Sequence, residues 1–152
     1  DWDVHHGNGT QAIFYDDPSV LYFSTHQYPF YPGTGDPSEI GRGEAIETTV
    51  NVALEVGSGD EQIVAAFERE LLPRAEAFKP ELVLISAGFD AHRDDPLAQL
   101  EVTEAGYRRL TELVRGIADR YARGRLVSAL EGGYNLQALA TSVDTHLRAL
   151  AA

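Results

Sequence analysis

The chain has 152 residues, 43% of them hydrophobic and none of them cysteine, which allows one domain with a packed core. The lack of cysteine excludes disulfides, thiolate metal sites and cysteine nucleophiles, so any metal must be held by histidines and carboxylates. The formal net charge of −12 argues against a nucleic-acid partner, and since neither a long apolar run nor a signal peptide is present, we expect no membrane partner and a cytoplasmic protein.

The first ten residues, Asp1-Trp2-Asp3-Val4-His5-His6-Gly7-Asn8-Gly9-Thr10, place two carboxylates and two imidazoles within six positions. Asp3 and His5 alternate with Val4, so on an extended backbone their side chains leave on one face and can bind one ion. Imidazole with carboxylate suits zinc or a similar divalent metal better than calcium. The alternative is an ordinary polar loop.

The first half of the chain predicts a helix, two strands and a long loop. Residues 10–15 form the helix, and residues 20–25, rich in β-branched and aromatic side chains, form a strand that ends near Ser24. Proline and glycine punctuate residues 27–43, which predicts a loop that is functional rather than a flexible connector. Residues 48–52 form the second strand.

The second half alternates helices and strands. A helix is predicted over 60–78, a strand over 82–86, a helix from 103 to 121, a strand over 126–130 and a closing helix over 136–150. The continuous apolar runs of the two strands predict that both of their faces are covered. We therefore expect an α/β fold, a three-layer sandwich with a mostly parallel central sheet, in a single partial domain over 1–152.

Three polar clusters follow strands of this predicted sheet: residues 24–26, 87–96 and 131–135. Residues 1–6 form a fourth cluster, which would also follow a strand if an apolar run preceded it in a longer parent chain. Because ligands of open parallel sheets bind at the carboxyl ends of the strands, we expect these clusters to lie along one edge.

Four motifs in chain order carry a family resemblance: residues 1–10, Tyr31-Pro-Gly-Thr-Gly35, Gly88-Phe89-Asp90 and Glu131-Gly-Gly-Tyr-Asn135. Together they resemble the zinc-dependent histone deacetylases, especially bacterial members close to class II and to the acetylpolyamine amidohydrolases. The match spans essentially the whole chain. The resemblance implies an arginase/deacetylase-like fold.

The resemblance implies that Asp3, His5 and Asp90 ligate a catalytic Zn²⁺, which polarises the substrate amide while an activated water attacks it. Tyr134 resembles the phenol that donates to the resulting oxyanion. The alternatives are a turn or capping aspartate for Asp90 and a half-buried strand-end tyrosine for Tyr134. Iron could occupy the same ligands.

Further roles follow from the same resemblance. Gly132 and Gly133 let the backbone approach the substrate, and Tyr31 resembles an aromatic wall of the acyl-lysine channel, although it could equally be an ordinary loop aromatic. Asp1 and Ser24 match a structural monovalent-cation site, which we expect to hold K⁺.

The remaining polar residues have no motif support. His26 and His146 are predicted to be solvated or satisfied within the core, and His92, Asp94 and Asp95 to be polar groups of a loop.

The predicted function is therefore the zinc-dependent hydrolysis of an acetylated amine, either acetyl-lysine in a protein or an acetylpolyamine. The alternative is a non-catalytic metal-binding or interaction domain with the same fold. An arginase-like two-metal site is disfavoured because it needs further Asp-rich motifs.

One catalytic element of the family is not found in these residues. The resemblance implies a tandem His-His general base upstream of the ligands, one of whose histidines Asp1 would orient. The only adjacent pair here, His5-His6, belongs to the ligand motif. We therefore expect residues 1–152 to be the C-terminal part of a catalytic domain that lacks its N-terminal strands, and to be marginally folded and inactive alone.

Overall fold

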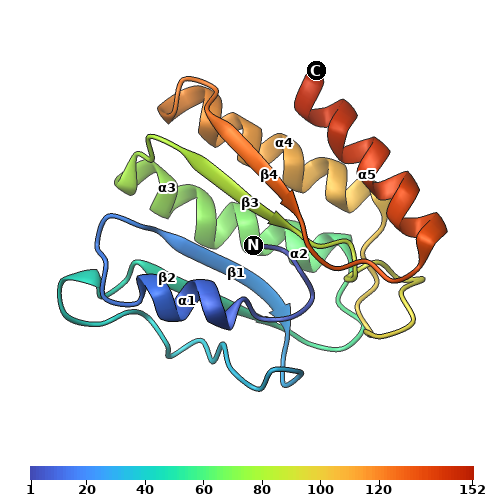
Figure 1. Cartoon of the computed structure of the whole chain (residues 1–152), viewed down its shortest axis with the longest axis horizontal. Coiled ribbons are helices and arrows are strands. Elements are labelled where there is room, and N and C mark those ends of the chain that lie inside the picture. Colours follow the sequence, from blue (N-terminus) through green and yellow to red (C-terminus); the bar gives the residue numbers. More distant parts are fainter.

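The computed structural model describes all 152 residues and has an α/β fold (Figure 1). The elements are α1 (Asn8–Phe14), β1 (Tyr22–Gln27), η1 (Gly43–Ala45), β2 (Thr49–Leu54), α2 (Asp60–Ala66), η2 (Phe67–Leu71), α3 (Leu72–Phe78), β3 (Val83–Ala87), α4 (Glu104–Tyr121), β4 (Leu126–Leu130) and α5 (Leu136–Ala151). The predicted order of strands and helices is confirmed. The expected end of the first strand near Ser24 is wrong, because β1 continues to pair with β2 as far as Gln27.

The predicted helix over 60–78 is continuous but irregular. Its middle, η2, is a π-helical turn that directly precedes α3, whose second residue is Pro73. Proline has no N–H to donate to the preceding turn, so the regular ladder is interrupted at this point. None of the helices has the length and the apolar character that crossing a membrane would need.

The strands form two parallel pairs, β1 with β2 and β3 with β4. The first residues of the chain lie between the pairs: the carbonyl of Asp1 accepts the N–H of Thr25 at 3.1 Å, and the N–H of Trp2 donates to the carbonyl of Ser86 at 3.2 Å. The N-terminal segment is thus held between the carboxyl-terminal halves of β1 and β3.

Helices α2 to α4 lie behind the strands in the view of Figure 1, α5 lies beside α4, and α1 lies in front of β1 and β2. The opposite face of the β3–β4 pair is open, with Leu84 68% and Val127 56% exposed. The prediction that both faces of these strands are covered is therefore wrong for residues 1–152. The parallel α/β class is confirmed, whereas the three-layer arrangement is not established.

The hydrophobic core anchors the N-terminal segment. Trp2 and Val4 are buried, and the Trp2 ring packs against Phe67, with centroids 6.2 Å apart, and against His146, at 5.6 Å. Because side chains alternate along extended backbone, burying Trp2 and Val4 turns the side chains of Asp3 and His5 the other way.

Candidate functional site

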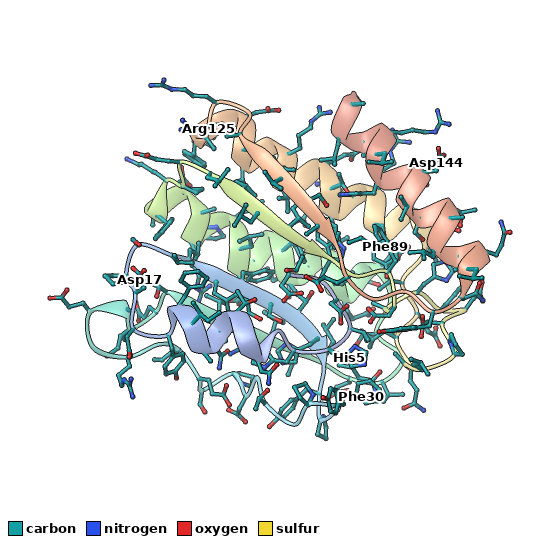
Figure 2. All side chains as sticks on the ribbon, in the orientation of Figure 1. His5, Asp17, Phe30, Phe89, Arg125 and Asp144 are labelled. Atoms are coloured by element: carbon teal, nitrogen blue, oxygen red, sulfur yellow. The ribbon has the colours of Figure 1, made fainter.

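Asp3, His5 and Asp90 converge at the carboxyl-terminal edge of the strands. One potential ligand atom from each residue lies within 4.8 Å of the others. The Nδ1 atom of His5 is 3.0 Å from Oδ1 of Asp3 and 3.2 Å from Oδ2 of Asp90. Figure 2 shows His5 beyond the ends of the strands, near Phe30. The structure therefore brings together the three residues that the sequence pattern singled out.

Backbone N–H groups hold the two carboxylates in place. Asp3 Oδ1 accepts the N–H of His5 at 2.8 Å, and its Oδ2 accepts the N–H of Gly132 at 2.8 Å. Asp90 Oδ1 accepts the N–H of Val4 at 2.8 Å. The second oxygen of Asp90 is buried and receives no hydrogen bond. A buried carboxylate oxygen without a donor is a position at which a cation fits.

The electrostatics of Asp90 support the same interpretation. Its side chain is fully buried, and this burial, followed by the negative charge of Asp3, raises the pKa of Asp90 to about 7. A divalent cation would offset the desolvation cost and the repulsion between the two carboxylates. Two carboxylates and one imidazole are a donor set that zinc accepts.

Two glycines allow the ligands to approach this closely. A Cβ on Gly132 would lie 2.7 Å from Oδ2 of Asp3 and closer still to Oδ2 of Asp90, and a Cβ on Gly88 would lie 2.5 Å from the Cα of Asp3. Gly133 differs: its φ is +142°, and an added Cβ would meet Leu139 of α5 at 2.8 Å. Gly133 therefore fits the turn against α5, and its role in substrate binding stays a prediction.

A pocket of about 640 Å³ opens beside Asp3 and His5. Its lining includes Asp3, His5, Tyr31, Leu97, Gly132 and Tyr134. Tyr134 is 51% exposed. Desolvation, followed by the negative charges of Asp90, Asp3 and Asp95, raises the pKa of its phenol. A tyrosine phenol is protonated at neutral pH even at its ordinary pKa, so the hydroxyl can donate a hydrogen bond into the pocket.

A larger groove of about 860 Å³ lies beside β2 and α3. Among its ionisable lining residues, Glu70 and Arg74 are bonded to each other at 2.6 Å. No set of converging metal ligands lies in this groove, so the smaller pocket is the candidate site.

An aromatic pair forms one side of this candidate site. Phe30 stacks on the His5 ring, with centroids 5.4 Å apart and an interplanar angle of 19°. Tyr31 meets His5 edge-on at 6.1 Å and is 76% exposed. Sequence reasoning named Tyr31 alone and missed Phe30, although the two adjacent aromatics were a signal that both could face the ligand.

The two predicted cation ligands lie on neighbouring backbone segments. The carbonyl of Asp1 pairs with the N–H of Thr25, whereas the hydroxyl of Ser24 is 3.0 Å from Nδ1 of His26. The potassium site stays a prediction. His26 is buried with its Nε2 atom 2.8 Å from the carbonyl of Gly35, and burial lowers its pKa to about 4.

Of the two alternatives predicted for His26 and His146, solvated or satisfied within the core, the structure shows the second. His146 of α5 is buried, with Nδ1 2.7 Å from Thr111 Oγ1 and Nε2 2.9 Å from Ser128 Oγ. Asp95, in contrast, was predicted to be merely a loop polar group, yet it is buried and its carboxylate accepts the N–H of Tyr134 at 2.8 Å. That contact joins residues 39 positions apart, which sequence spacing does not reveal.

These features define a class of protein: an α/β domain that gathers carboxylates and an imidazole into a metal-ligand set at the carboxyl end of parallel strands. Residues 1–150 match the family model described as the histone deacetylase domain. The chain belongs to the histone deacetylase family.

Relatives and solved structures agree with this assignment. Over 150 residues the chain is 49% identical to histone deacetylase 14, chloroplastic, from Arabidopsis thaliana, covering 99% of this chain and 36% of that protein. It is 48% identical over 149 residues to the human polyamine deacetylase HDAC10, covering 94% of this chain and 22% of that one.

A third relative is a probable deacetylase from Archaeoglobus fulgidus, 46% identical over 137 residues, which are 90% of this chain and 38% of that protein. The crystal structure of the HDA15 HD domain superposes with a TM-score of 0.90 at 44% identity, covering 98% of this chain and 42% of that one. The histone deacetylase Clr3 superposes with a TM-score of 0.92 at 43% identity, over 98% and 25%. The chain spans about a third of the length of the first curated relatives that it matches.

Proposed function

We propose that this chain is the zinc-binding part of a deacetylase that hydrolyses the amide of an acetylated amine, either acetyl-lysine in a protein or an acetylpolyamine. The observation that carries the proposal is the convergence of Asp3, His5 and Asp90 beside a buried Asp90 oxygen that has no donor. The names of the relatives, which include histone and polyamine deacetylases, support both substrate classes.

In the proposed mechanism Asp3, His5 and Asp90 hold the metal. When bound, zinc supplies Lewis-acid polarisation of the amide carbonyl. Tyr134, whose phenol is protonated at neutral pH, donates a hydrogen bond to the carbonyl oxygen as negative charge develops there. Phe30 and Tyr31 form an aromatic wall that excludes water from one side.

The proposal needs a general base that residues 1–152 do not supply. His6 is the histidine adjacent to a ligand, but its Nδ1 atom is 2.7 Å from the hydroxyl of Thr34 and its Nε2 atom is 2.9 Å from Oε1 of Gln11. Since Gln11 Oε1 is an acceptor, Nε2 carries the proton and Nδ1 accepts from Thr34. His6 is thus engaged on both nitrogens, and a tandem His pair outside these residues is the proposed base.

The test uses the full-length protein and three variants. We expect purified protein to contain zinc and to release acetate from an acetyl-lysine peptide or an acetylpolyamine. Asp90→Ala should lose both zinc and activity, whereas Tyr134→Phe should keep zinc and lose roughly 10²–10³ in kcat. The matched control is Asp144→Ala, an exposed carboxylate paired with Arg148, which should change neither.

Two outcomes would contradict the proposal, the first its ligand assignment and the second its catalytic function. Retained activity in Asp90→Ala would refute the ligand assignment. Zinc binding by the full-length protein without acetate release from either substrate would favour the alternative, a metal-binding or interaction domain without catalysis.

A further inference from the structure

A single buried carboxylate joins two loops that line the pocket. Asp95 is 7% exposed. Its Oδ1 atom accepts the N–H of Leu97 at 2.9 Å, and its Oδ2 atom accepts the N–H of Tyr134 at 2.8 Å. Leu97 and Tyr134 both line the 640 Å³ pocket. One side chain therefore fixes the backbone of two lining residues that belong to different loops.

The loop that carries Asp95 is itself anchored. The N–H of Asp95 donates to the carbonyl of His92 at 2.9 Å. Next to it, Nδ2 of Asn135 donates to the carbonyl of Asp94 at 2.9 Å, while Oδ1 of Asn135 caps the first turn of α5. The segment 134–135 is thus tied to the segment 94–95 by two hydrogen bonds, both donated by the segment 134–135.

The chemistry of this connection requires a carboxylate. Both oxygens of Asp95 act as acceptors, and hydrogen bonds from N–H groups to an ionised acceptor are stronger than neutral ones. An asparagine could accept at one oxygen, but its NH₂ group would oppose the second N–H. Asparagine keeps the local turn to Leu97, which Asn side chains also form, so its NH₂ group would face the N–H of Tyr134 and release it, with very little change in side-chain volume.

The phenol of Tyr134 depends on this backbone anchor. No hydrogen bond from a neighbouring side chain holds the hydroxyl, and half of the side chain is exposed. The direction of the ring is therefore determined mainly by the backbone from which it projects. Asp95 has no hydrogen bond to Asp3, His5 or Asp90, so its influence on the pocket passes through Tyr134 and Leu97.

We propose that Asp95 is a positioning residue that acts through Tyr134, holding the phenol where it can donate to the substrate carbonyl. This inference rests on the proposed function, because it assumes the catalytic role of Tyr134. A purely structural role for Asp95 would instead change zinc affinity and global stability together with activity.

The experiment is a double-mutant cycle in the full-length, zinc-loaded protein with Asp95→Asn, Tyr134→Phe and the double variant. Asp95→Asn should lower kcat by roughly 10–50-fold, with zinc affinity and KM within about threefold of wild type. The double variant should be no slower than Tyr134→Phe within about threefold, because Asp95 has nothing left to position.

A second measurement does not depend on activity. The amide of Tyr134 should exchange its hydrogen at least about tenfold faster in Asp95→Asn, with zinc or without it, because its acceptor is lost. The matched control is Asp94→Asn, because the Asp94 side chain is exposed and its ion-pair contact, with Nδ1 of His92, is as long as 3.9 Å. It should leave exchange and kcat unchanged. If Asp95→Asn does not fold, Asp95→Glu keeps both acceptor oxygens but displaces them by one methylene, and the same cycle applies.

The outcomes separate this inference from the proposed function. Wild-type kcat in Asp95→Asn beside an impaired Tyr134→Phe would overturn the positioning role alone. So would losses that multiply in the double variant, or a loss of zinc affinity that parallels the loss of kcat. Full activity of Tyr134→Phe would refute the proposed role of Tyr134 and the inference with it.

Discussion

Replacement of Gly132 by alanine should strongly weaken zinc binding, although it replaces none of the three proposed ligands. A Cβ at this position would lie 2.7 Å from Oδ2 of Asp3, inside the 3.0 Å that real Cβ contacts respect, and closer still to Oδ2 of Asp90. The Asp3 oxygen must therefore move by at least 0.3 Å, and the Asp90 oxygen by more. Metal sites tolerate about 0.2 Å in ligand distances.

Neither side of this clash can move freely. The carbonyl of Gly132 accepts the N–H of Phe89 at 2.7 Å, and Oδ1 of Asp90 is held by the N–H of Val4 at 2.8 Å. Changes near a metal that leave its ligands intact cost about 10–100-fold in affinity. Because two ligands are displaced here, we expect a loss of about 100-fold or more, roughly 2.8 kcal/mol.

The assay is competition for zinc with a chromophoric chelator, using full-length wild type and Gly132→Ala. The matched control is Gly116→Ala: Gly116 is exposed on α4 and an added Cβ meets nothing within 4 Å. This control should keep its zinc affinity and gain about 0.5–1 kcal/mol of stability. Zinc affinity of Gly132→Ala within about threefold of wild type would refute the assignment of Asp3 and Asp90 as ligands.

Two further predictions concern His146 and the aromatic wall. Burial lowers the pKa of His146, so as pH falls below about 6.5 the unfolded chain takes up a proton at this ring before the folded chain does, and stability is lost. The thermal midpoint of wild type should therefore fall more steeply with acidification than that of His146→Gln. Equal slopes would contradict this prediction. Phe30→Leu removes the stack on His5 and should weaken zinc binding, measured by zinc titration, by roughly 2–10-fold. Tyr31→Leu should leave zinc binding unchanged and raise KM in steady-state kinetics. The opposite pattern would assign the support of His5 to Tyr31 and substrate contact to Phe30.

The convergence of Asp3, His5 and Asp90 was predictable because the family resemblance named all three residues and two physical rules agree with it. Alternation along extended backbone places Asp3 and His5 on one face, and Asp90 follows a strand whose carboxyl end meets the same sheet edge. The buried Trp2 and Val4 explain why the alternation holds: the core fixes the intervening positions and so the direction of the ligands. Here the local pattern and the topology lead to the same atoms.

The covering of β3 and β4 could not be predicted in the same way. An apolar run such as residues 82–86 indicates that a strand prefers apolar surroundings, but it carries no information on which element supplies them. In the structure Ile85 is buried against the helices while Leu84, one residue earlier, is open. Coverage of that second face depends on atoms distant in sequence, and a strand's own sequence does not contain them.

Phe30 and Asp95 were missed for a related reason. Each acts through a contact with a residue far away along the chain, Phe30 with His5 and Asp95 with Tyr134. The local signals at both positions, an aromatic in a proline-rich loop and an aspartate before a proline, are equally typical of surface turns. Burial and the partner distinguish the two cases, and both are properties of the folded chain.

The adjacent residues His5 and His6 are chemically identical but have different contacts in the folded chain. His5 contacts the carboxylates of Asp3 and Asp90, whereas the two ring nitrogens of His6 contact Thr34 and Gln11. Through Gln11 this second ring is linked to the amide of Asn51 on β2. Because both ring nitrogens of His6 are engaged in these contacts, His6 stabilises the loop around Thr34. The two neighbours therefore differ in role: His5 belongs to the proposed ligand set, and His6 is a structural side chain.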